Sequence, residues 1–322
     1  MPEANTIVGP YQNSVFSWSK NTWMHRAVAA IGLLLITTTF CAMQSAANGA
    51  AQSQLTVGAG DFEFPDNTGY GVRSIRVFYY RPQALTSESP IIFVMHGVHR
   101  DAQRYMREWI PYALQCNFLL LCPEFDAKQF PTQAYQRGNM FDASKNPIPE
   151  PCWTFSTIER LFDYVRSVSN NKRQGYFIYG HSAGGQFVHR FVLFMPSARY
   201  ERAIAANPGY FTMPNYSGHA FPYGLRNSGL SESSLRCSFT RDFVLLLGDQ
   251  DIDPDDPDLR KTGNAEEQGA TRFERGQNYF RAAQVEAARL GGRLEWRLKT
   301  VEGAHHSDAQ MIQAAVGAFF AK

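Results

Sequence analysis

The sequence has little excess charge of either sign. Its 322 residues include 31 Lys and Arg against 29 Asp and Glu, a formal net charge of only +2. No run of Lys and Arg occurs, so an electrostatic nucleic-acid binder is not expected. After residue 60 the chain also lacks internal repeats and low-complexity linkers, which excludes solenoids and propellers.

Metal-binding patterns are also lacking. The chain has five cysteines, none with C-x-x-C spacing. The acidic run at 249–258 resembles a calcium loop, but Pro254 and Arg260 stand where an EF-hand needs Gly and Glu. His96 and His99 lack nearby metal-ligating partners in the sequence, and His96 is expected to brace its loop by hydrogen bonding. We therefore expect no metal and no cofactor.

The first 50 residues form a segment of a different kind. Residues 27–60 contain no charged side chain, and residues 27–43 within them are almost wholly apolar. Arg26 precedes this run and small residues follow it, the pattern of a secretory signal peptide. The run is short for a membrane anchor, and no basic cluster follows it. We expect a secreted or periplasmic protein without stable membrane insertion after processing, with Met24 as an alternative start.

The rest of the chain, residues 51–322, alternates between strand and helix patterns and is expected to form one domain. Apolar residues make up 44% of the sequence, enough for a large core. Strands are expected at 72–81, 91–95, 117–122, 175–179, 202–206, 242–247 and 294–300, and helices at about 101–115, 154–168, 184–195, 269–290 and 308–320. We expect the first of these strands to be an outer one, and residues 58–60 (GAG) to be a flexible start of the mature protein. The alternation predicts an α/β fold with a mostly parallel central sheet flanked by helices.

A candidate nucleophile lies where one expected strand passes into a helix. Residues 180–184 read GHSAG, which matches G-x-S-x-G, and they follow the strand GYFIY directly. Such a sharp turn forces Ser182 into strained backbone angles and lifts its hydroxyl clear of the sheet. Small neighbours at Gly180 and Gly184 let strand and helix pass closely. The context therefore favours a nucleophile over an ordinary helix N-cap.

A serine nucleophile needs a base, and the base needs an orienting carboxylate. On this architecture the chain order is Ser, then acid, then His. The acid is expected just after the strand at 242–247, where Asp249, Asp251 and Asp253 follow. Of the eight histidines in the chain, only His305 and His306 lie beyond that point. Elimination therefore leaves two candidates for the base.

From about residue 72 to the C-terminus, the chain resembles the α/β-hydrolase family, particularly its secreted serine esterases. Residues 95–98 (MHGV) resemble the family's oxyanion segment, and GHSAG resembles its nucleophile elbow. The Gly-x-x-Asp at 248–251 resembles its acid turn, and the stretch around 303–307 resembles its histidine loop. His-Gly followed by Arg-Asp-Ala resembles, more loosely, polyhydroxybutyrate depolymerases and feruloyl esterases.

The resemblance implies a role for each of these residues. Ser182 would attack an ester carbonyl, His306 would accept and return its proton, and Asp251 would orient the imidazole. Backbone N–H groups of Val98 and Ala183 would form the oxyanion hole. The family's loop pattern favours His306 over His305, although His305 occupies a position usually held by a small residue. The Gly-x-x-Asp spacing favours Asp251 over its neighbours.

Two long irregular stretches are expected to shape the substrate pocket. Residues 123–151 and a cap loop at about 208–235 both carry several Phe and Tyr residues, and long loops in a compact domain are usually functional. An aromatic-lined cleft favours apolar or aromatic acyl groups, although each ring could instead anchor its loop. Cys152 and Cys237 both flank this region. We expect the exported protein to carry at least one disulfide, with these two cysteines as the pair.

These observations predict a cofactor-free serine hydrolase that acts on carboxylic esters, either small molecules or polymers. A serine peptidase or amidase on the same fold is the alternative enzyme. A non-catalytic binding protein that retained the fold is the alternative from another class, but binding alone requires none of the Ser, Asp and His side chains.

Overall fold

The computed structural model describes residues 55–68 and 73–321. Residues 53–322 form one compact unit, and the predicted signal segment at 1–50 lies outside the described residues. Among the residues that are described, no helix is both long enough and apolar enough to span a bilayer.

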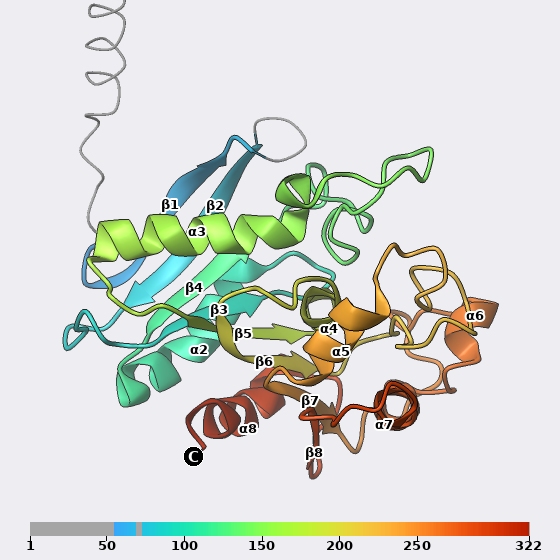
Figure 1. Ribbon diagram of the computed structural model, residues 1–322. Helices are drawn as coiled ribbons and strands as arrows, with labels where there is room; N and C mark the ends of the chain where they lie inside the picture. Colours follow the sequence, from blue (N-terminus) through green and yellow to red (C-terminus); the bar gives the residue numbers. More distant parts are fainter. Residues whose placement is uncertain (1–54, 69–72, 322) are drawn as a thin grey trace, which may run out of the picture. The chain divides into compact units, whose positions relative to one another are not determined.

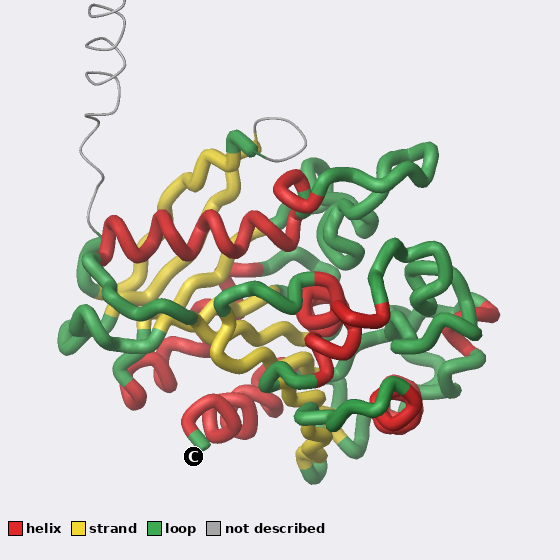
Figure 2. The backbone as a smooth tube through the Cα atoms, in the orientation of Figure 1, coloured by secondary structure: helices red, strands yellow, loops and turns green. Residues whose placement is uncertain are grey.

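An eight-stranded sheet runs through the unit in the order β1-β2-β4-β3-β5-β6-β7-β8 (Figures 1 and 2). The strands are β1 (Gly58–Asp66), β2 (Arg73–Arg81), β3 (Ile91–Met95), β4 (Leu119–Glu124), β5 (Tyr176–His181), β6 (Tyr200–Ala206), β7 (Phe243–Gly248) and β8 (Arg297–Val301). β2 pairs antiparallel with both β1 and β4. The six strands in the order β4-β3-β5-β6-β7-β8 are mutually parallel. The predicted α/β fold with a mostly parallel sheet is confirmed.

Helices cover both faces of the sheet. They are α2 (Ala102–Cys116), η1 (Glu150–Cys152), α3 (Thr154–Ser169), α4 (Ala183–Phe194), α5 (Glu232–Phe239), α6 (Gly263–Glu266), α7 (Arg272–Arg289) and α8 (Asp308–Phe320). One apolar cluster joins the sheet to α3, α4, α5 and α7, and a second joins it to α2 and α8. The central strands β3, β5 and β7 are buried along their whole length, as expected for strands covered on both faces.

The N-terminal edge of the sheet differs from the prediction. Residues 58–60 are not a flexible start but the beginning of β1, so β2 lies inside the sheet and not at its edge. A Cβ atom added at Gly60 would lie 2.5 Å from the Tyr79 hydroxyl oxygen. Glycine therefore allows the ring of Tyr79 to pack across the neighbouring strand, a contact that the sequence pattern did not reveal.

The expectation of a disulfide between Cys152 and Cys237 is also wrong. Cys116, Cys122, Cys152 and Cys237, the cysteines of the described part of the chain, are all free thiols. Cys152 lies in η1, which packs against α3, whereas Cys237 is exposed on α5, which packs against α4 and α7. Their nearness to the expected pocket in sequence does not bring the two sulfur atoms together.

The carboxyl ends of the parallel strands converge on one edge of the sheet, and the connections that leave this edge carry the candidate catalytic residues. Two long irregular segments also extend from it. One lies between β4 and η1, and the other lies between β6 and α5. Figure 2 shows both as loops beyond the strand ends.

Candidate active site

Ser182 occupies a strained turn between β5 and α4. Its backbone φ is 55° and its ψ is −112°, values that a non-glycine residue rarely adopts. A Cβ atom added at Gly180 would lie 2.2 Å from the carbonyl oxygen of Gly184, and one added at Gly184 would lie 2.0 Å from the carbonyl oxygen of Met95. The two glycines therefore permit a close approach that no larger residue would allow, and the serine is held at the first turn of α4.

The three side chains predicted to form a triad lie together. His306 Nε2 is 3.0 Å from Ser182 Oγ, and His306 Nδ1 is 2.7 Å from Asp251 Oδ2. The side chain of Asp251 is 2% exposed, whereas that of His306 is 17% exposed and so remains accessible. A buried carboxylate behind a partly open imidazole fixes which ring nitrogen faces the serine.

The alternatives left open by the sequence have other roles. Asp249 accepts a hydrogen bond from the Gly303 amide, and Asp253 accepts one from the Asp255 amide. His305 uses its backbone: its carbonyl accepts from Asn207 Nδ2, and its amide donates to Gln310. Of these candidates, Asp251 and His306 are the pair that reaches Ser182.

A buried arginine that the sequence analysis missed supports the acid. Arg272, at the start of α7, donates to Asp251 Oδ1 at 3.2 Å and forms a bidentate ion pair with Asp256 at 2.9 Å. Its side chain is 1% exposed. The hydrogen bonds from Arg272 lower the pKa of Asp256 to about 2. The signal available in the sequence was the excess of aspartates in 249–258, which calls for a nearby cation.

Asn207, directly after β6, is a second residue that the sequence analysis missed. Its Oδ1 accepts a hydrogen bond from the Gly248 amide at 2.8 Å, and its Nδ2 donates to the His305 carbonyl at 3.3 Å. A Cβ atom added at Gly248 would lie 2.4 Å from the carbonyl oxygen of Ala304. The acid turn and the histidine loop are therefore packed directly against each other, with Asn207 joining them.

The expected oxyanion donors, Val98 and Ala183, both lie near Ser182. Val98 lines the same cavity of about 240 Å³ as Ser182 and His306, and Ala183 is the first residue of α4. Within the described residues, neither backbone N–H donates to another protein group. The first N–H groups of a helix have no intrahelical acceptor, and the helix dipole favours negative charge there.

The loop that carries Val98 is braced by His96, as predicted. The Phe125 amide donates to His96 Nε2 at 3.0 Å, so Nδ1 carries the proton that is donated to the Gly97 carbonyl. Tyr135 donates to the His96 carbonyl at 2.7 Å. Burial lowers the pKa of His96 to about 4, which keeps the ring neutral. This histidine therefore fixes the loop.

His181, the residue before Ser182, is buried against the imidazole of His306. Its ring centroid lies 4.7 Å from that of His306, with the planes tilted by 35°. Its Nδ1 lies 3.2 Å from the hydroxyl of Tyr105. Burial, reinforced by the nearby His306, lowers the pKa of His181 well below its usual value. The ring is therefore a neutral platform for His306, consistent with the predicted packing role.

Most aromatic residues of the two irregular segments anchor those segments. Phe125, Phe130 and Tyr135 belong to the buried core. In the second segment, Tyr210 and Phe211 are buried as well, and Thr212 is held by a hydrogen bond from its amide to His189 Nε2. Phe141 and Phe221 instead line a cavity between the segments. In the described part of the chain, no three His, Cys, Asp or Glu side chains are grouped as metal ligands.

Comparisons with known proteins agree with this fold. The chain is 38% identical to poly(aspartic acid) hydrolase-1 from Sphingomonas sp. KT-1, with a TM-score of 0.78 over 81% of this chain and 98% of that one. It is 34% identical to a poly(3-hydroxybutyrate) depolymerase from Bordetella parapertussis, with a TM-score of 0.78 over 82% and 90% of the two chains.

A more distant likeness extends to an S-formylglutathione hydrolase from Agrobacterium tumefaciens. The two chains are 17% identical, with a TM-score of 0.52 over 82% of this chain and 94% of that one. This likeness supports the fold alone. No protein-family model and no curated protein sequence matches the chain.

Proposed function

Because the chain belongs to the α/β-hydrolase family, we propose that it is a serine hydrolase that cleaves carboxylic esters through an acyl-enzyme intermediate. One observation carries the proposal: Ser182 Oγ, His306 and Asp251 form a continuous hydrogen-bonded chain at a strained elbow. A structural serine needs neither the strained turn nor the buried acid behind the imidazole.

In the proposed reaction, His306 Nε2 accepts the proton of Ser182 as Oγ attacks the ester carbonyl. The negative charge that develops on the carbonyl oxygen is stabilised by the N–H groups of Val98 and Ala183, each contributing about 3–4 kcal/mol in related chemistry. His306 then gives the proton to the departing alcohol. Water, activated by the same imidazole, releases the acid. Asp251 keeps the Nδ1 proton in place and stabilises the imidazolium that forms.

The substrates that we propose are esters with apolar or aromatic acyl groups, either small or polymeric. Phe141 and Phe221 support this range, because their rings lie 5.4 Å apart and line the cavity between the two irregular segments. Likeness to a poly(3-hydroxybutyrate) depolymerase supports the polymeric end of the range. An apolar cleft gains about 0.8 kcal/mol for each methylene that it buries, so kcat/KM should rise with acyl length until the cleft is full.

The test is a Ser182→Ala variant assayed on p-nitrophenyl acetate, butyrate and octanoate and on an aromatic acyl ester. We expect wild-type turnover and covalent labelling by a fluorophosphonate, and loss of both in the variant, with kcat lower by several orders of magnitude. Thermal unfolding is the control for an intact fold. Retention of more than about a few per cent of wild-type kcat by the variant would contradict the role of Ser182.

Amide hydrolysis is a second candidate, and the likeness to poly(aspartic acid) hydrolase-1 favours it. The units of such a polymer are joined by amide bonds, so the same site would have to expel an amine. A p-nitroanilide that matches the best ester discriminates between the two: faster turnover of the anilide would favour the amidase. A folded protein that neither turns over any of these compounds nor reacts with the fluorophosphonate would instead be a binding protein.

We also propose that the protein is exported to the periplasm or secreted. The charge-free stretch at 27–60, with Arg26 before it, supports a signal peptide that is removed near residues 46–54. N-terminal sequencing of protein recovered from outside the cytoplasm is the measurement. Retention of residues 27–43 in that protein would show that the segment is an anchor or a part of the mature chain.

A further inference from the structure

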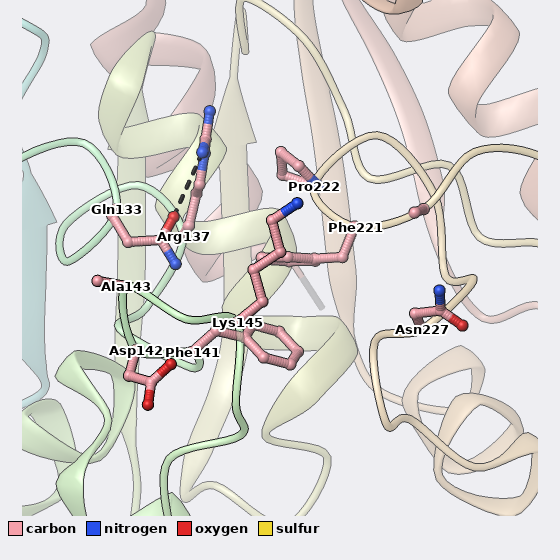
Figure 3. A pocket seen from close by; sticks show the side chains of 10 residues that line it. Gln133, Arg137, Phe141, Asp142, Ala143, Lys145, Phe221, Pro222 and Asn227 are labelled. Atoms are coloured by element: carbon pink, nitrogen blue, oxygen red, sulfur yellow. Dashed lines mark hydrogen bonds between the residues drawn. The ribbon is translucent and has the colours of Figure 1, made fainter.

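A cavity of about 610 Å³ lies between the two irregular segments, apart from the small cavity at Ser182. Figure 3 shows the first segment on one side, with Arg137 and Lys145, and the second on the other, with Phe221, Pro222 and Asn227. One wall is apolar, because Phe221 packs against both Phe141 and Phe194. The cavity therefore offers an apolar surface beside two cationic groups.

The two cations have no anionic partner. Across the described ranges, neither Arg137 nor Lys145 forms an ion pair with a carboxylate. Arg137 donates to two neutral oxygens, the hydroxyl of Tyr210 and Oε1 of Gln133, both at 3.3 Å. Asp142 also lines the cavity, but its carboxylate accepts hydrogen bonds from the backbone and side chain of Asn146, and its side chain points away from Lys145 in Figure 3.

A third cation, Arg190, makes this region more positive. Arg190 on α4 is fully buried and lacks a carboxylate partner within the described residues. Its guanidinium lies 4.7 Å from the ring centroid of Tyr210, the residue that Arg137 also contacts. Burial lowers the pKa of Arg190 to about 10. Burial alone would raise the pKa of Tyr210, but Arg190 and Arg137 outweigh it and the net direction is downward.

We propose that this cavity is a distal subsite that binds a carboxylate on the substrate, at the end remote from the scissile ester. This inference rests on the proposed esterase function and adds a substrate class to it: chains that are apolar in the middle and carry a terminal carboxylate. The planar guanidinium of Arg137 can bind a carboxylate through two N–H groups, and Lys145 adds a second positive charge. Phe141 and Phe221 cover the apolar part of the chain.

The spacing along α4 gives a scale for the substrate length that would join the nucleophile to the subsite. Arg190 does not line the cavity, but it contacts Tyr210, as the cavity residue Arg137 does. It is eight residues beyond Ser182 along α4, and a helix rises 1.5 Å per residue, so the backbone positions of Ser182 and Arg190 are about 12 Å apart. An extended chain advances roughly 3.5 Å for every three backbone bonds, so about ten bonds cover this distance. Acetate and butyrate esters are too short, whereas a ten-carbon diacid has the required length.

The experiment compares a charged and a neutral form of one substrate. The acyl-side pair is the mono-p-nitrophenyl ester of decanedioic acid and its methyl-capped counterpart. The alcohol-side pair is 10-acetoxydecanoate and its methyl ester. We expect the wild type to prefer the carboxylate in one of the two pairs, expressed as the ratio of kcat/KM for the charged form to that for the neutral form. The p-nitrophenyl monoester of butanedioic acid should show no such preference.

Variants then assign the preference to the cavity. Arg137→Gln should lower the ratio about tenfold, because a charge-assisted hydrogen bond contributes at least this much to binding. Lys145→Gln should lower it less, since Lys145 is exposed. Lys128→Gln, in the same segment but outside the cavity lining, is the matched control and should leave the ratio unchanged. An unchanged ratio in both cavity variants, or no preference in either wild-type pair, would overturn the proposal.

A binding measurement separates failure of the subsite from failure of the esterase function. Decanedioate is titrated calorimetrically into Ser182→Ala, with and without Arg137→Gln. We expect binding that weakens in the double variant and with added salt, whereas decane-1,10-diol should not bind comparably. If esters are not turned over but this pattern holds, the esterase proposal fails and the subsite stands. If esters are turned over but decanedioate binds both variants equally, the subsite fails.

Discussion

Arg272 and His306 contact opposite oxygens of one buried carboxylate. Arg272 Nη1 lies 3.2 Å from Asp251 Oδ1, and His306 Nδ1 lies 2.7 Å from Oδ2. Asp251 therefore has little freedom to rotate, and its negative charge is balanced at a site where water is excluded. The imidazole is oriented by a carboxylate that is itself held by α7, far along the chain from Ser182.

Replacing Arg272 by leucine should reduce both stability and activity. Removal of one partner leaves Asp251 and Asp256 without their cation, and breaking a buried pair in this way costs about 3–5 kcal/mol. A freed carboxylate also misplaces the imidazole, so we expect kcat to fall about 10–100-fold with a smaller effect on KM. Urea unfolding and steady-state kinetics measure the two effects.

Two further variants separate positioning from general damage to α7. Arg272→Lys keeps the charge and should recover part of kcat. Arg281→Leu changes an exposed arginine on the same helix and should alter neither quantity. If Arg272→Leu loses stability but keeps wild-type kcat at a temperature where it is folded, Arg272 is a structural residue only.

Replacement of His305 and of His306 by alanine should have very different effects on kcat/KM. His306→Ala removes the group that contacts both Ser182 and Asp251, so kcat/KM should fall as far as it does in Ser182→Ala. His305→Ala should be mild, because the contacts of His305 with Asn207 and Gln310 are made by its backbone. Comparing kcat/KM of the two variants on one ester is sufficient. Greater damage in His305→Ala would place the base one residue earlier.

The sequence could predict that Ser182, Asp251 and His306 lie together because of how the parallel sheet is built. The strands before Ser182 and Asp251 are buried and read clearly as apolar runs, whereas β8, which precedes His306, is a partly exposed edge strand. Parallel strands bring their carboxyl ends to one edge. Elimination among histidines led to the loop that places His306 beside Ser182, because the fold fixes the order of the motifs. The sequence therefore specified the backbone position of each candidate group.

Contacts made between elements distant in the chain could not be predicted in this way. Arg272 reaches Asp251 from a helix that begins 21 residues later, and nothing in its local pattern distinguishes it from an exposed arginine. Gly60 was interpreted by its flexibility, although its small size is what Tyr79 requires. The expected cysteine pair failed for the same reason: proximity in sequence to one pocket does not specify which helices pack together.

A phenylalanine at position 181 should leave the pH profile of the reaction in place. Because burial holds the pKa of His181 well below 6.5, the residue is neutral near neutral pH. His181→Phe keeps a ring beneath His306 but loses the contact with Tyr105, so we expect a modest fall in kcat. The acid limb of kcat/KM against pH should not move. A displaced limb would show that His181 itself gains a proton in the pH range of the reaction.

Asp308, two residues after His306, is a buried carboxyl at the start of α8. Tyr179 donates a hydrogen bond to its Oδ1 at 2.7 Å. Burial raises the pKa of Asp308 from 3.8 to about 7, with Glu108 adding to the rise and the Tyr179 hydroxyl opposing it. The folded protein therefore holds a proton near neutral pH that the unfolded chain has already released.

Because of this proton, the free energy of unfolding of the wild type should fall, relative to that of Asp308→Asn, as the pH rises. For a carboxyl whose folded pKa is raised, the stabilising contribution is complete below the unfolded pKa, near 4, and is lost as the pH rises through 7. Urea unfolding of both proteins at intervals from pH 4 to pH 8 gives the difference in free energy of unfolding. We expect that difference to change by about 4 kcal/mol in favour of the variant, since each unit of pKa shift corresponds to about 1.4 kcal/mol. Any fixed cost of burying the amide cancels, because it is the same at every pH.

Tyr179→Phe should move the pH range of this change upward, since it removes the hydrogen bond that favours the ionised carboxyl of Asp308. A difference that stays constant from pH 4 to pH 8 would mean that Asp308 is ionised in the folded protein.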